Sequence, residues 1–343
     1  MPYLELDDLI FEIQKFGGAS TYWRELTDRL SEFIPGEIIH TKAYRVLRLY
    51  SPRSSARVFH SSHFRVSSSS SVKNVTTIHD LIYEKGLVGG RGKLINLYER
   101  KKSVVRADAI ICISESTRQD FYEYYGGLIG IKPVYVIHHG CTKLPVGSAD
   151  QLSAFDSPAY SDLDLMSGRF FMFVGGRSGY KNFELLLKAF VIGSFQNQGF
   201  RIICTGAGFS DYERELIGNL KLSEAVISIG LVDANALGKL YGVARALVYP
   251  SAYEGFGLPA LEAMAAGCPV ICAAASSLPE VVGESGILID PRSAEQLADA
   301  MSSVLVDETR FHFSQAGIER AKLFDWRESA RAHAQVYESL AAF

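Results

Sequence analysis

Short apolar runs alternate with longer amphipathic stretches through the second half of the chain. The apolar runs predict strands over residues 170–174, 200–205, 226–229, 246–249 and 269–272. The stretches between them repeat their apolar positions with helical spacing, which predicts helices at 182–195, 211–220, 234–244 and from 259 onward. Strands separated by helices of about a dozen residues are typical of a parallel, doubly wound α/β sheet.

The first half of the chain shows the same alternation with weaker signals. Strands are predicted at 9–13, 75–78, 109–113 and 134–137, and helices at 21–33 and 91–106. Ser114 is expected to cap the helix that follows the third of these strands, with Thr117 at its N3 position. Residues 50–74 carry many serines and are expected to include a solvent loop with poor order.

The length of 343 residues suits two domains better than one. Between the two halves the pattern weakens into Gly, Ser, Asp, Pro and Ala, which are typical of an interdomain linker. We therefore expect a first α/β domain at 1–145, a linker at 146–168 and a second α/β domain at 169–325. The amphipathic helix predicted at 326–343 is expected to pack back toward the first domain.

Composition and charge narrow the possible functions. The chain is 48% hydrophobic and 21% charged with a net charge of −3, which argues against nucleic acid as its main partner. The first residues lack a basic segment followed by an apolar one, and no window approaches about 18 uninterrupted apolar residues. We therefore expect no signal peptide, no transmembrane helix and a cytoplasmic location. The five cysteines lie mostly in apolar runs and are expected to be buried thiols: Cys112, Cys141, Cys204, Cys268 and Cys272.

The segment from Tyr249 to Met264 combines a strand end, a glycine-bearing loop and a helix start. Glu254 lies in the loop, and Glu262 follows within about the first two turns of the helix. Ligands of open α/β sheets bind outside the carboxyl ends of the strands, and a glycine loop before a helix suits phosphate. Carboxylates next to a phosphate need an explanation. Hydroxyl groups of a sugar or ribose in the same ligand, which could bind Glu254 and Glu262, would provide one. The alternative is one solvated loop acid and one acid that favours the helix dipole.

Other strand ends carry groups suited to the same ligand. Gly17 and Gly18 lie between a predicted strand and a helix, where backbone N–H groups can bind an anion, although a plain turn would use the same glycines. His79 directly follows a β-branched strand, a position more typical of a site than of a core histidine. Arg177 and Lys181 precede a helix, where a guanidinium and an ammonium can neutralise a diphosphate without a metal. An ordinary basic turn is the alternative.

Weaker features point to other ligands. His60 and His63 lack an evident third metal ligand, so the better interpretation is that one of them lines an acceptor cleft. Asp162 and Asp164 resemble a metal-binding DxD motif, but they lie in the predicted linker with no strand before them. The run 206–208 lacks the third glycine of a dinucleotide fingerprint, which disfavours a dehydrogenase.

The helix predicted at 91–106 is basic. Its cations include Arg100, Lys101, Lys102 and Arg106. Such a run usually indicates a solvated face. A second interpretation is contact with an anionic membrane surface or a lipid-phosphate acceptor.

The segment from Glu254 to Glu262 matches the E-x7-E motif of retaining glycosyltransferases with the GT-B fold, family GT4 (glycosyltransferase group 1). Other segments of the chain match the same family: 17–18, 79–80, 177–182, 249–251 and 266–271. The chain resembles in particular the bacterial, mannosyltransferase-like members that build cell-surface polysaccharides. The resemblance covers nearly the whole chain and implies two Rossmann-like doubly wound domains facing a central cleft. Fewer residues than usual precede the Gly-Gly turn, which departs from the family pattern.

The resemblance implies a role in the reaction for four residues. Arg177 and Lys181 would hold the donor diphosphate and stabilise the leaving group. Glu254 would lie against the donor sugar, and His79 would reach the same sugar from the first domain.

The remaining matching residues would bind the donor. Glu262 would accept hydrogen bonds from the ribose hydroxyls, and Val232 would lie near the base. Backbone groups would contact the diphosphate or the sugar at Gly17, Gly18, Phe256, Gly257 and Leu258.

By resemblance, the reaction moves a hexose from a nucleotide-diphosphate sugar to a hydroxyl of a saccharide or lipid-linked acceptor, with retention at the anomeric carbon. The departing phosphate would accept the acceptor's proton, so no dedicated base, metal or cofactor is expected. GDP-mannose is the favoured donor and UDP-glucose the next. The alternatives are a non-catalytic sugar-nucleotide-binding subunit and a sugar-nucleotide epimerase of GT-B shape. The E-x7-E match argues against the epimerase, and the presence of Arg177, Lys181, Glu254 and Glu262 argues against the non-catalytic subunit.

Overall fold

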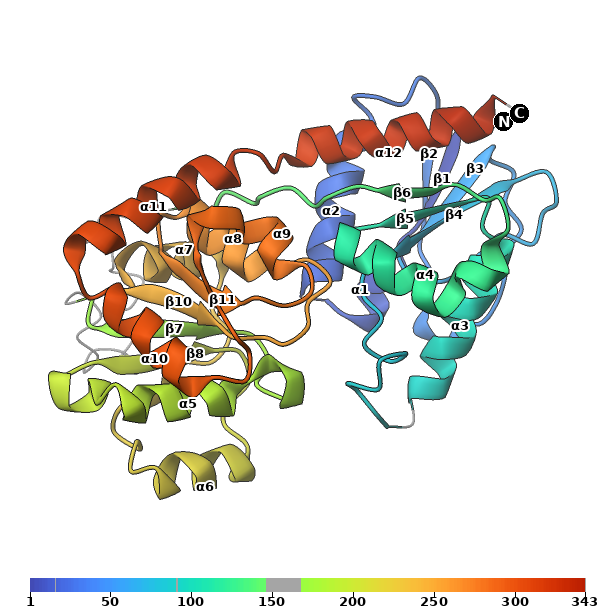
Figure 1. Ribbon diagram of the computed structural model, residues 1–343. Coiled ribbons are helices and arrows are strands. Elements are labelled where there is room, and N and C mark those ends of the chain that lie inside the picture. Colours follow the sequence, from blue (N-terminus) through green and yellow to red (C-terminus); the bar gives the residue numbers. More distant parts are fainter. Residues whose placement is uncertain (16, 91, 146–167, 343) are drawn as a thin grey trace. The chain divides into compact units, whose positions relative to one another are not determined.

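The computed structural model describes residues 1–15, 17–90, 92–145 and 168–342 (Figure 1). The chain divides into two compact units, the first built from Met1–Gly140 with Phe324–Phe343 and the second from Cys141–Leu323. Each unit contains one six-stranded sheet in which every strand pair is parallel. No helix within the described ranges is long and apolar enough to cross a bilayer.

The sheet of unit 1 has the strand order β2-β1-β3-β4-β5-β6. Its strands are β1 (Leu4–Asp7), β2 (Ile38–Thr41), β3 (Val58–Ser61), β4 (Lys73–Ile78), β5 (Ala109–Cys112) and β6 (Val134–Val136). The helices are α1 (Ile10–Ile13), α2 (Gly18–Leu30), α3 (Gly92–Arg106), α4 (Glu115–Ile129) and α12 (Trp326–Ala341), with a 3-10 turn η1 (Arg45–Leu47). Helix α12 packs against α2 within this unit. The predicted cap of α4 is confirmed, because the Ser114 hydroxyl accepts a hydrogen bond from the Thr117 N–H at 3.0 Å.

The strand predicted at 9–13 is wrong. The first strand is β1, Leu4–Asp7, and residues Ile10–Ile13 form α1. Every residue of β1 is buried, including the carboxylates of Glu5 and Asp7. Asp7 pairs with Arg65 at 2.7 Å, and Glu5 accepts a hydrogen bond from Ser54 at 2.6 Å. Partners distant in sequence therefore make an acidic segment suitable for the centre of a sheet.

The segment 50–74 contains the buried strand β3, which the sequence did not predict, between two stretches without helix or strand. Several of its serines are buried with it: Ser54, Ser61, Ser62 and Ser67. The Ser67 N–H donates to the Asn74 side chain at 2.7 Å, and the Ser69 hydroxyl donates to the Ser54 carbonyl at 2.8 Å. Serines that satisfy backbone groups in this way fold a segment whose composition resembles that of a disordered one.

The sheet of unit 2 has the order β12-β11-β10-β7-β8-β9. Its strands are β7 (Phe170–Val174), β8 (Arg201–Thr205), β9 (Val226–Ser228), β10 (Ala246–Tyr249), β11 (Val270–Ala273) and β12 (Ile287–Ile289). Its helices are α5 (Phe183–Ile192), α6 (Asp211–Asn219), α7 (Ala234–Val243), α8 (Leu258–Ala265), α9 (Leu278–Val282), α10 (Ala294–Ser303) and α11 (Asp307–Ala321). The predicted elements of this half are confirmed to within a few residues, whereas β12 and α9 had no sequence prediction. The predicted linker lies almost entirely outside the described residues.

The strand order of unit 2 reverses beside β7. From β7 the chain adds β8 and β9 on one side and then returns to add β10, β11 and β12 on the other. The loops that follow β7 and β10 therefore leave the sheet in opposite directions. In open α/β sheets, this switch point is where ligands bind.

Candidate active site

The loops after β7 and β10 meet at the switch point through an ion pair. Lys181 ends the 3-10 turn η4 (Gly179–Lys181), and its Nζ lies 2.6 Å from Glu254 Oε1. The same ammonium lies 3.4 Å from the Tyr249 hydroxyl at the end of β10. Lys181 and Glu254 keep 17% and 13% of their side chains exposed, so the pair is accessible to a ligand.

Backbone and amide contacts fix the positions of these two loops. Asn182 adopts the left-handed conformation and donates its side-chain amide to the Pro250 carbonyl at 2.9 Å and to the Pro291 carbonyl at 3.0 Å. The Ala252 N–H donates to the Tyr180 carbonyl at 2.7 Å. The loop carrying the cation and the loop carrying the carboxylate are thus held together by contacts that do not use either charge.

Two serines after β11 hold the Glu254 loop from its other side. The Ser276 hydroxyl accepts from the Glu254 N–H at 2.8 Å. The Ser277 hydroxyl lies 2.9 Å from the Glu254 carbonyl and 2.8 Å from the Phe256 carbonyl. Sequence analysis missed both serines, although their position directly after a strand resembles that of the other site residues.

Helix α8 begins at this loop without a side-chain cap. Its N-cap Gly257 has a φ of 110°, and a Cβ there would lie 2.7 Å from a methyl carbon of Leu278, so the turn requires glycine. By contrast, α6, α7 and α10 of the same unit are capped by Ser210, Asp233 and Ser293. A helix start without a side-chain acceptor is suited to an anionic ligand.

Glu262 lies on α8 as a carboxyl group without a countercharge. Its carboxyl group has no hydrogen-bond or ion-pair partner among the residues that the structure describes. Burial raises the pKa of Glu262 to about 7. Hydroxyl groups that donate to a carboxylate favour its charged form, so a ribose would supply what this group lacks.

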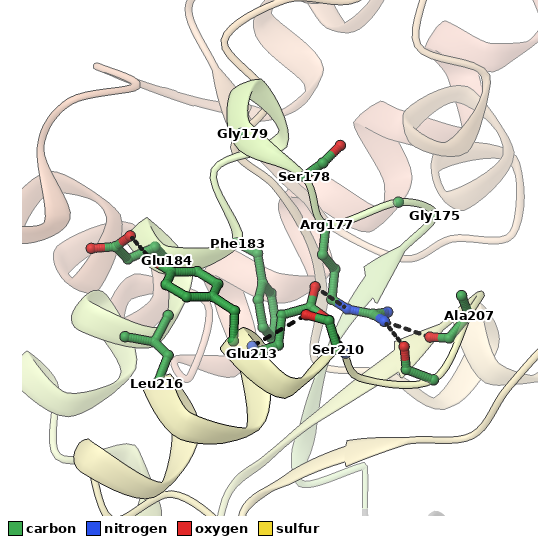
Figure 2. A pocket seen from close by; sticks show the side chains of 13 residues that line it. Gly175, Arg177, Ser178, Gly179, Phe183, Glu184, Ala207, Ser210, Glu213 and Leu216 are labelled. Carbon is green, nitrogen blue, oxygen red and sulfur yellow. Dashed lines mark hydrogen bonds and ion pairs between the residues drawn. The ribbon is translucent and has the colours of Figure 1, made fainter. Parts of the chain in front are cut away.

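Arg177 points toward the loop after β8 (Figure 2). Its Nε lies 3.0 Å from Glu213 Oε1, and its Nη2 donates to the carbonyls of Ala207 and Gly208, the latter at 2.8 Å. The guanidinium stands 4.9 Å from the Phe209 ring centroid. Its side chain is only 3% exposed.

The Arg177 side chain borders a hollow of about 630 Å³ between the first turns of α5 and α6 (Figure 2). Glycines after β7 and β8 form one wall, and Phe183 and Leu216 form another. The Nη1 of Arg177 is buried and has no hydrogen-bond partner within the described part of the chain. Glu213 holds the cation in place while it also forms the capping box of α6 with Ser210. The Ser-x-x-Glu spacing could have revealed that cap from the sequence, but not its contact with Arg177.

The other donor-binding residues predicted in unit 2 lie at loop ends. Val232 is half-buried directly before Asp233, the N-cap of α7. Phe256 and Leu258 are buried, so their backbone groups rather than their side chains are suited to ligand contact. The structure brings Lys181 and Glu254 together and places Arg177 with Glu213. The roles of these residues toward a donor stay predictions.

In unit 1, Gly17 is the N-cap of α2 and has a φ of 133°, a conformation that residues with a side chain rarely adopt. No side chain caps α2 at Gly17. His79 follows β4, and its ring stands edge-on to Tyr22 with the centroids 4.9 Å apart. Burial lowers the pKa of His79 to about 4, so the imidazole is neutral at physiological pH. A neutral ring can donate one hydrogen bond and accept another, as a sugar hydroxyl requires.

Of the two histidines predicted as alternatives for an acceptor cleft, the structure excludes His60. His60 is fully buried in the core of unit 1, where its Nδ1 lies 2.7 Å from the Tyr337 hydroxyl and its Nε2 lies 2.9 Å from the Thr77 hydroxyl. His63 is 14% exposed and lies 3.5 Å from Glu99. Asp162 and Asp164 lie outside the described residues. Within those residues, no three His, Cys, Asp or Glu side chains form a group able to hold a metal ion.

The five cysteines are free, as the sequence predicted. Cys112, Cys204, Cys268 and Cys272 are buried, and Cys141 is half-buried. Burial raises the pKa of each thiol, so none is set up as a thiolate nucleophile.

Several curated proteins resemble part of this chain. The O-antigen chain mannosyltransferase B of Escherichia coli is 34% identical over 174 residues, which are 49% of this chain and 45% of that protein. A D-inositol 3-phosphate glycosyltransferase of Corynebacterium glutamicum (strain R) is 33% identical over 181 residues, which are 50% of this chain and 43% of that protein. The aligned part of the chain thus spans less than half the length of these relatives.

Solved structures resemble the whole chain. The sucrose-phosphate synthase of Thermosynechococcus elongatus superposes with a TM-score of 0.74 at 22% identity, covering 100% of both chains. Anabaena Alr3699/HepE in complex with UDP and glucose has a TM-score of 0.74 at 18% identity, covering 99% of this chain and 100% of that one. The predicted α/β GT-B fold is confirmed.

Family models match both units. The model for Glycosyl transferases group 1 matches residues 165–321, which contain the Lys181–Glu254 pair and Glu262. The model for Glycosyltransferase Family 4 matches residues 37–142. By these two matches, the chain belongs to the group 1 glycosyl transferases of family 4.

Proposed function

We propose that this protein is a retaining, metal-independent hexosyltransferase that uses a nucleotide-diphosphate sugar, with GDP-mannose the favoured donor and UDP-glucose the next. One observation carries the proposal. The Lys181–Glu254 pair lies at the sheet's switch point, beside the uncapped start of α8, and Glu262 on α8 has no countercharge among the residues described. A cation, a helix start and an unpartnered carboxyl group match the diphosphate and the ribose of one ligand.

In this proposal the largest catalytic contribution is electrostatic. Cleavage of the bond between the sugar and the phosphate develops negative charge on the diphosphate, and preorganised cations and amides at that position lower the barrier. Lys181 supplies the cation, and the first turn of α8 supplies amides. Arg177 would add a second cation, with Glu213 as the residue that positions its guanidinium in the free protein.

Donor binding would also change the partner of Glu254. In the structure, the Glu254 carboxylate neutralises Lys181. A diphosphate brings stronger charge to the same ammonium, which would release the carboxylate toward the sugar hydroxyls. The ion pair would then keep the site neutral while it is empty and separate when the donor arrives.

The acceptor would be a hydroxyl of a saccharide or of a lipid-linked saccharide used in surface polysaccharide synthesis. Attack on the same face as the leaving group would retain the anomeric configuration, with the departing phosphate accepting the proton. The mannosyltransferase names of the relatives and the UDP bound in a structural neighbour support this substrate class. A cytoplasmic location and peripheral contact with the inner face of the membrane would fit a lipid-linked acceptor.

A thermal-shift panel of nucleotide sugars tests the proposal. One nucleotide sugar should stabilise the protein by about 2.7 kcal/mol when present at about 100 times its Kd. The product formed from that donor should keep its anomeric configuration, which NMR of the anomeric proton reports. Stabilisation without turnover of any offered saccharide would favour the non-catalytic sugar-nucleotide-binding subunit. No response to any nucleotide sugar would contradict both functions.

A further inference from the structure

Unit 1 exposes an unusual concentration of large apolar side chains around η1. Five of the seven residues at 44–50 are apolar or aromatic and exposed: Tyr44, Val46, Leu47, Leu49 and Tyr50. Val46 is 89% exposed. Contiguous apolar surface of this kind usually marks a place where another surface binds.

Helix α3 continues this apolar surface. Leu94, Tyr98, Lys101 and Val105 follow one another at spacings of three or four residues, so they share one exposed face of the helix. Leu94 is 77% exposed, and Ile95 flanks the stripe. The opposite face of α3 is buried in unit 1, so the stripe is not the helix's core-facing side.

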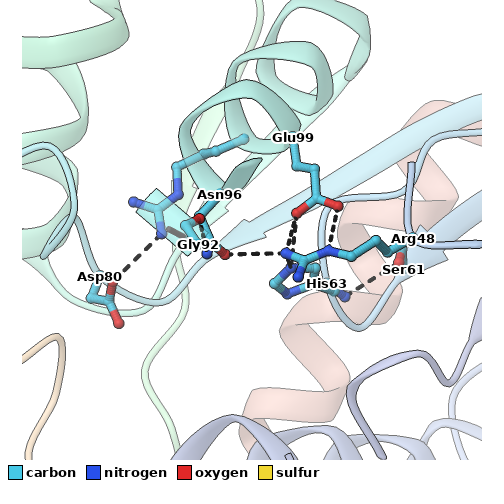
Figure 3. A network of polar contacts seen from close by, with 8 residues as sticks. Arg48, Ser61, His63, Asp80, Gly92, Asn96 and Glu99 are labelled. Carbon is cyan, nitrogen blue, oxygen red and sulfur yellow. Dashed lines mark hydrogen bonds and ion pairs between the residues drawn. The ribbon is translucent and has the colours of Figure 1, made fainter. Parts of the chain in front are cut away.

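Polar contacts fasten the stretch 44–50 to α3 (Figure 3). Arg48 Nε donates to Glu99 Oε1 at 2.7 Å. Lys102 Nζ donates to the Leu49 carbonyl at 3.0 Å. The stretch and the helix therefore form one surface. We call it the η1–α3 surface, defined by Tyr44, Val46, Leu47, Leu49, Tyr50, Leu94, Ile95, Tyr98 and Val105.

The sequence around the η1–α3 surface is rich in cations. Residues 38–79 contain seven Lys and Arg but no Asp or Glu, and three of these cations pair with acids from other parts of unit 1: Arg48, Arg65 and Lys73. Helix α3 has a single acid, Glu99, whose side chain is 3% exposed and is covered by Arg48. Arg45, Lys101 and Arg106 are exposed beside the apolar side chains. The chain as a whole has a net charge of −3, so this region is more positive than the rest of the protein.

We propose that the η1–α3 surface docks this protein on an anionic phospholipid bilayer. Apolar side chains would enter the boundary between headgroups and acyl chains, while Arg45 and Lys101 would meet lipid phosphates. The inference rests on the proposed function, because an enzyme held at a bilayer would reach a lipid-linked acceptor.

Two other occupants fit this surface less well. A second copy of the chain would bring like cations against one another, which costs free energy at an interface. A nucleic acid would need aromatic or planar groups for base stacking, whereas most of the exposed side chains here are aliphatic.

Co-sedimentation of the full chain with vesicles tests the docking. One vesicle preparation contains phosphatidylcholine alone, and the other contains phosphatidylcholine with phosphatidylglycerol. The wild type should bind the second at least roughly tenfold more tightly, and the preference should weaken with salt. The double variant Val46→Glu/Leu94→Glu should lose roughly tenfold or more of that binding. The matched control is Phe311→Glu on α11, an apolar residue that is 67% exposed in unit 2, and it should bind as the wild type does.

A second pair of substitutions tests the cations of the η1–α3 surface separately from its apolar side chains. Arg45→Glu/Lys101→Glu should remove the preference for phosphatidylglycerol. Each variant should keep the thermal-shift response to the donor, which shows that the protein is folded and the sugar-nucleotide site is intact. Vesicle binding without any donor response would contradict the proposed function alone.

Three results would overturn the docking. The wild type would fail to bind anionic vesicles, or the Val46→Glu/Leu94→Glu variant would bind them as the wild type does. Alternatively, light scattering would show a dimer that the same variant abolishes, which would assign the surface to a second copy of the chain.

Discussion

The two units share a sheet architecture but differ in whether their polar groups are accessible or buried. Unit 2 leaves Lys181 and Glu254 accessible at the sheet's switch point, and within the described part of the chain Glu262 has no partner. Unit 1 buries polar groups within its strands and helices and joins them to one another. Accessible, incompletely partnered groups indicate ligand chemistry, whereas buried, mutually satisfied groups indicate fold specificity.

The buried groups of unit 1 form a hydrogen-bond chain whose direction follows from one carbonyl. His333 Nδ1 lies 2.7 Å from the Ser329 carbonyl and must donate to it, so the neutral ring accepts at Nε2 from Tyr22. Tyr22 then accepts from Thr77, and Thr77 accepts from His60 Nε2.

At the other end of this hydrogen-bond network, His60 contacts Tyr337. With its Nε2 donating, its Nδ1 must accept from the Tyr337 hydroxyl at 2.7 Å. Burial lowers the pKa of both His60 and His333, which keeps each ring neutral and this direction intact. The two ends of this hydrogen-bond network, His333 and Tyr337, both lie on α12. The network therefore fastens the C-terminal helix to β3, β4 and α2.

The largest expected effect comes from removing Lys181, the accessible cation of unit 2. Lys181→Ala should lower kcat/KM by at least an order of magnitude, because a lost charged contact is worth roughly 1.5–3 kcal/mol. Lys188→Ala is the matched control, since Lys188 makes an exposed ion pair with Glu184 on α5 and should behave as the wild type does. Unchanged turnover of Lys181→Ala, with wild-type stability, would remove Lys181 from the mechanism.

The corresponding change in unit 1 should affect stability rather than donor binding. Tyr337→Phe leaves His60 Nδ1 buried without a donor, which should lower the free energy of unfolding by about 1–3 kcal/mol. Denaturant unfolding measures this loss. Tyr212→Phe removes a hydroxyl from an exposed side chain on α6 and should change stability by less than about 0.5 kcal/mol. Equal stabilities of the two variants would show that the buried hydrogen-bond network of unit 1 does not stabilise the fold.

Glu262 gives a pH test of the accessible site. Its pKa of about 7 in the free protein should fall when ribose hydroxyls donate to the carboxylate, so the donor binds the ionised form more tightly. Donor affinity should therefore fall as pH drops below about 7, approaching about tenfold per pH unit. Calorimetric titration across pH 5.5–8.5, a range of about three units, measures the slope. Glu262→Gln should flatten it, and an identical slope in that variant would exclude Glu262 as the titrating group.

The smallest expected effect is that of a chelator. In the proposed reaction, protein cations and amides neutralise the diphosphate, so EDTA should leave turnover nearly unchanged. An assay with EDTA and with added Mn²⁺ checks this. Strict dependence on Mn²⁺ would contradict the proposal and return attention to Asp162 and Asp164.

The sequence predicted unit 2 well because its determinants are local. Strands such as β7 and β10 are short apolar runs bounded by glycine or proline, and the switch-point residues lie in the loops that follow them. The E-x7-E segment also carries its own turn and helix signals, which placed Glu254 and Glu262 correctly. The contact of Arg177 with Glu213 could not be predicted, because it depends on the packing of the β8–α6 loop against β7.

The sequence predicted unit 1 less well because its determinants are distant pairs. Asp7 is tolerated in β1 only because Arg65 neutralises it, and His60 is tolerated in β3 only because Tyr337 and Thr77 satisfy it. Neither pair leaves a local pattern. The sequence therefore placed the first strand at 9–13 instead of at Leu4–Asp7, and it did not predict β3.

The most direct test of the account is calorimetric binding of the nucleotide sugar that stabilises the wild type. The account predicts one site per chain, with affinity at least about tenfold weaker in Lys181→Ala and unchanged in Lys188→Ala. Equal affinities of the two variants, or binding at a different stoichiometry, would show that the nucleotide sugar is held elsewhere than at the β7–β10 switch point.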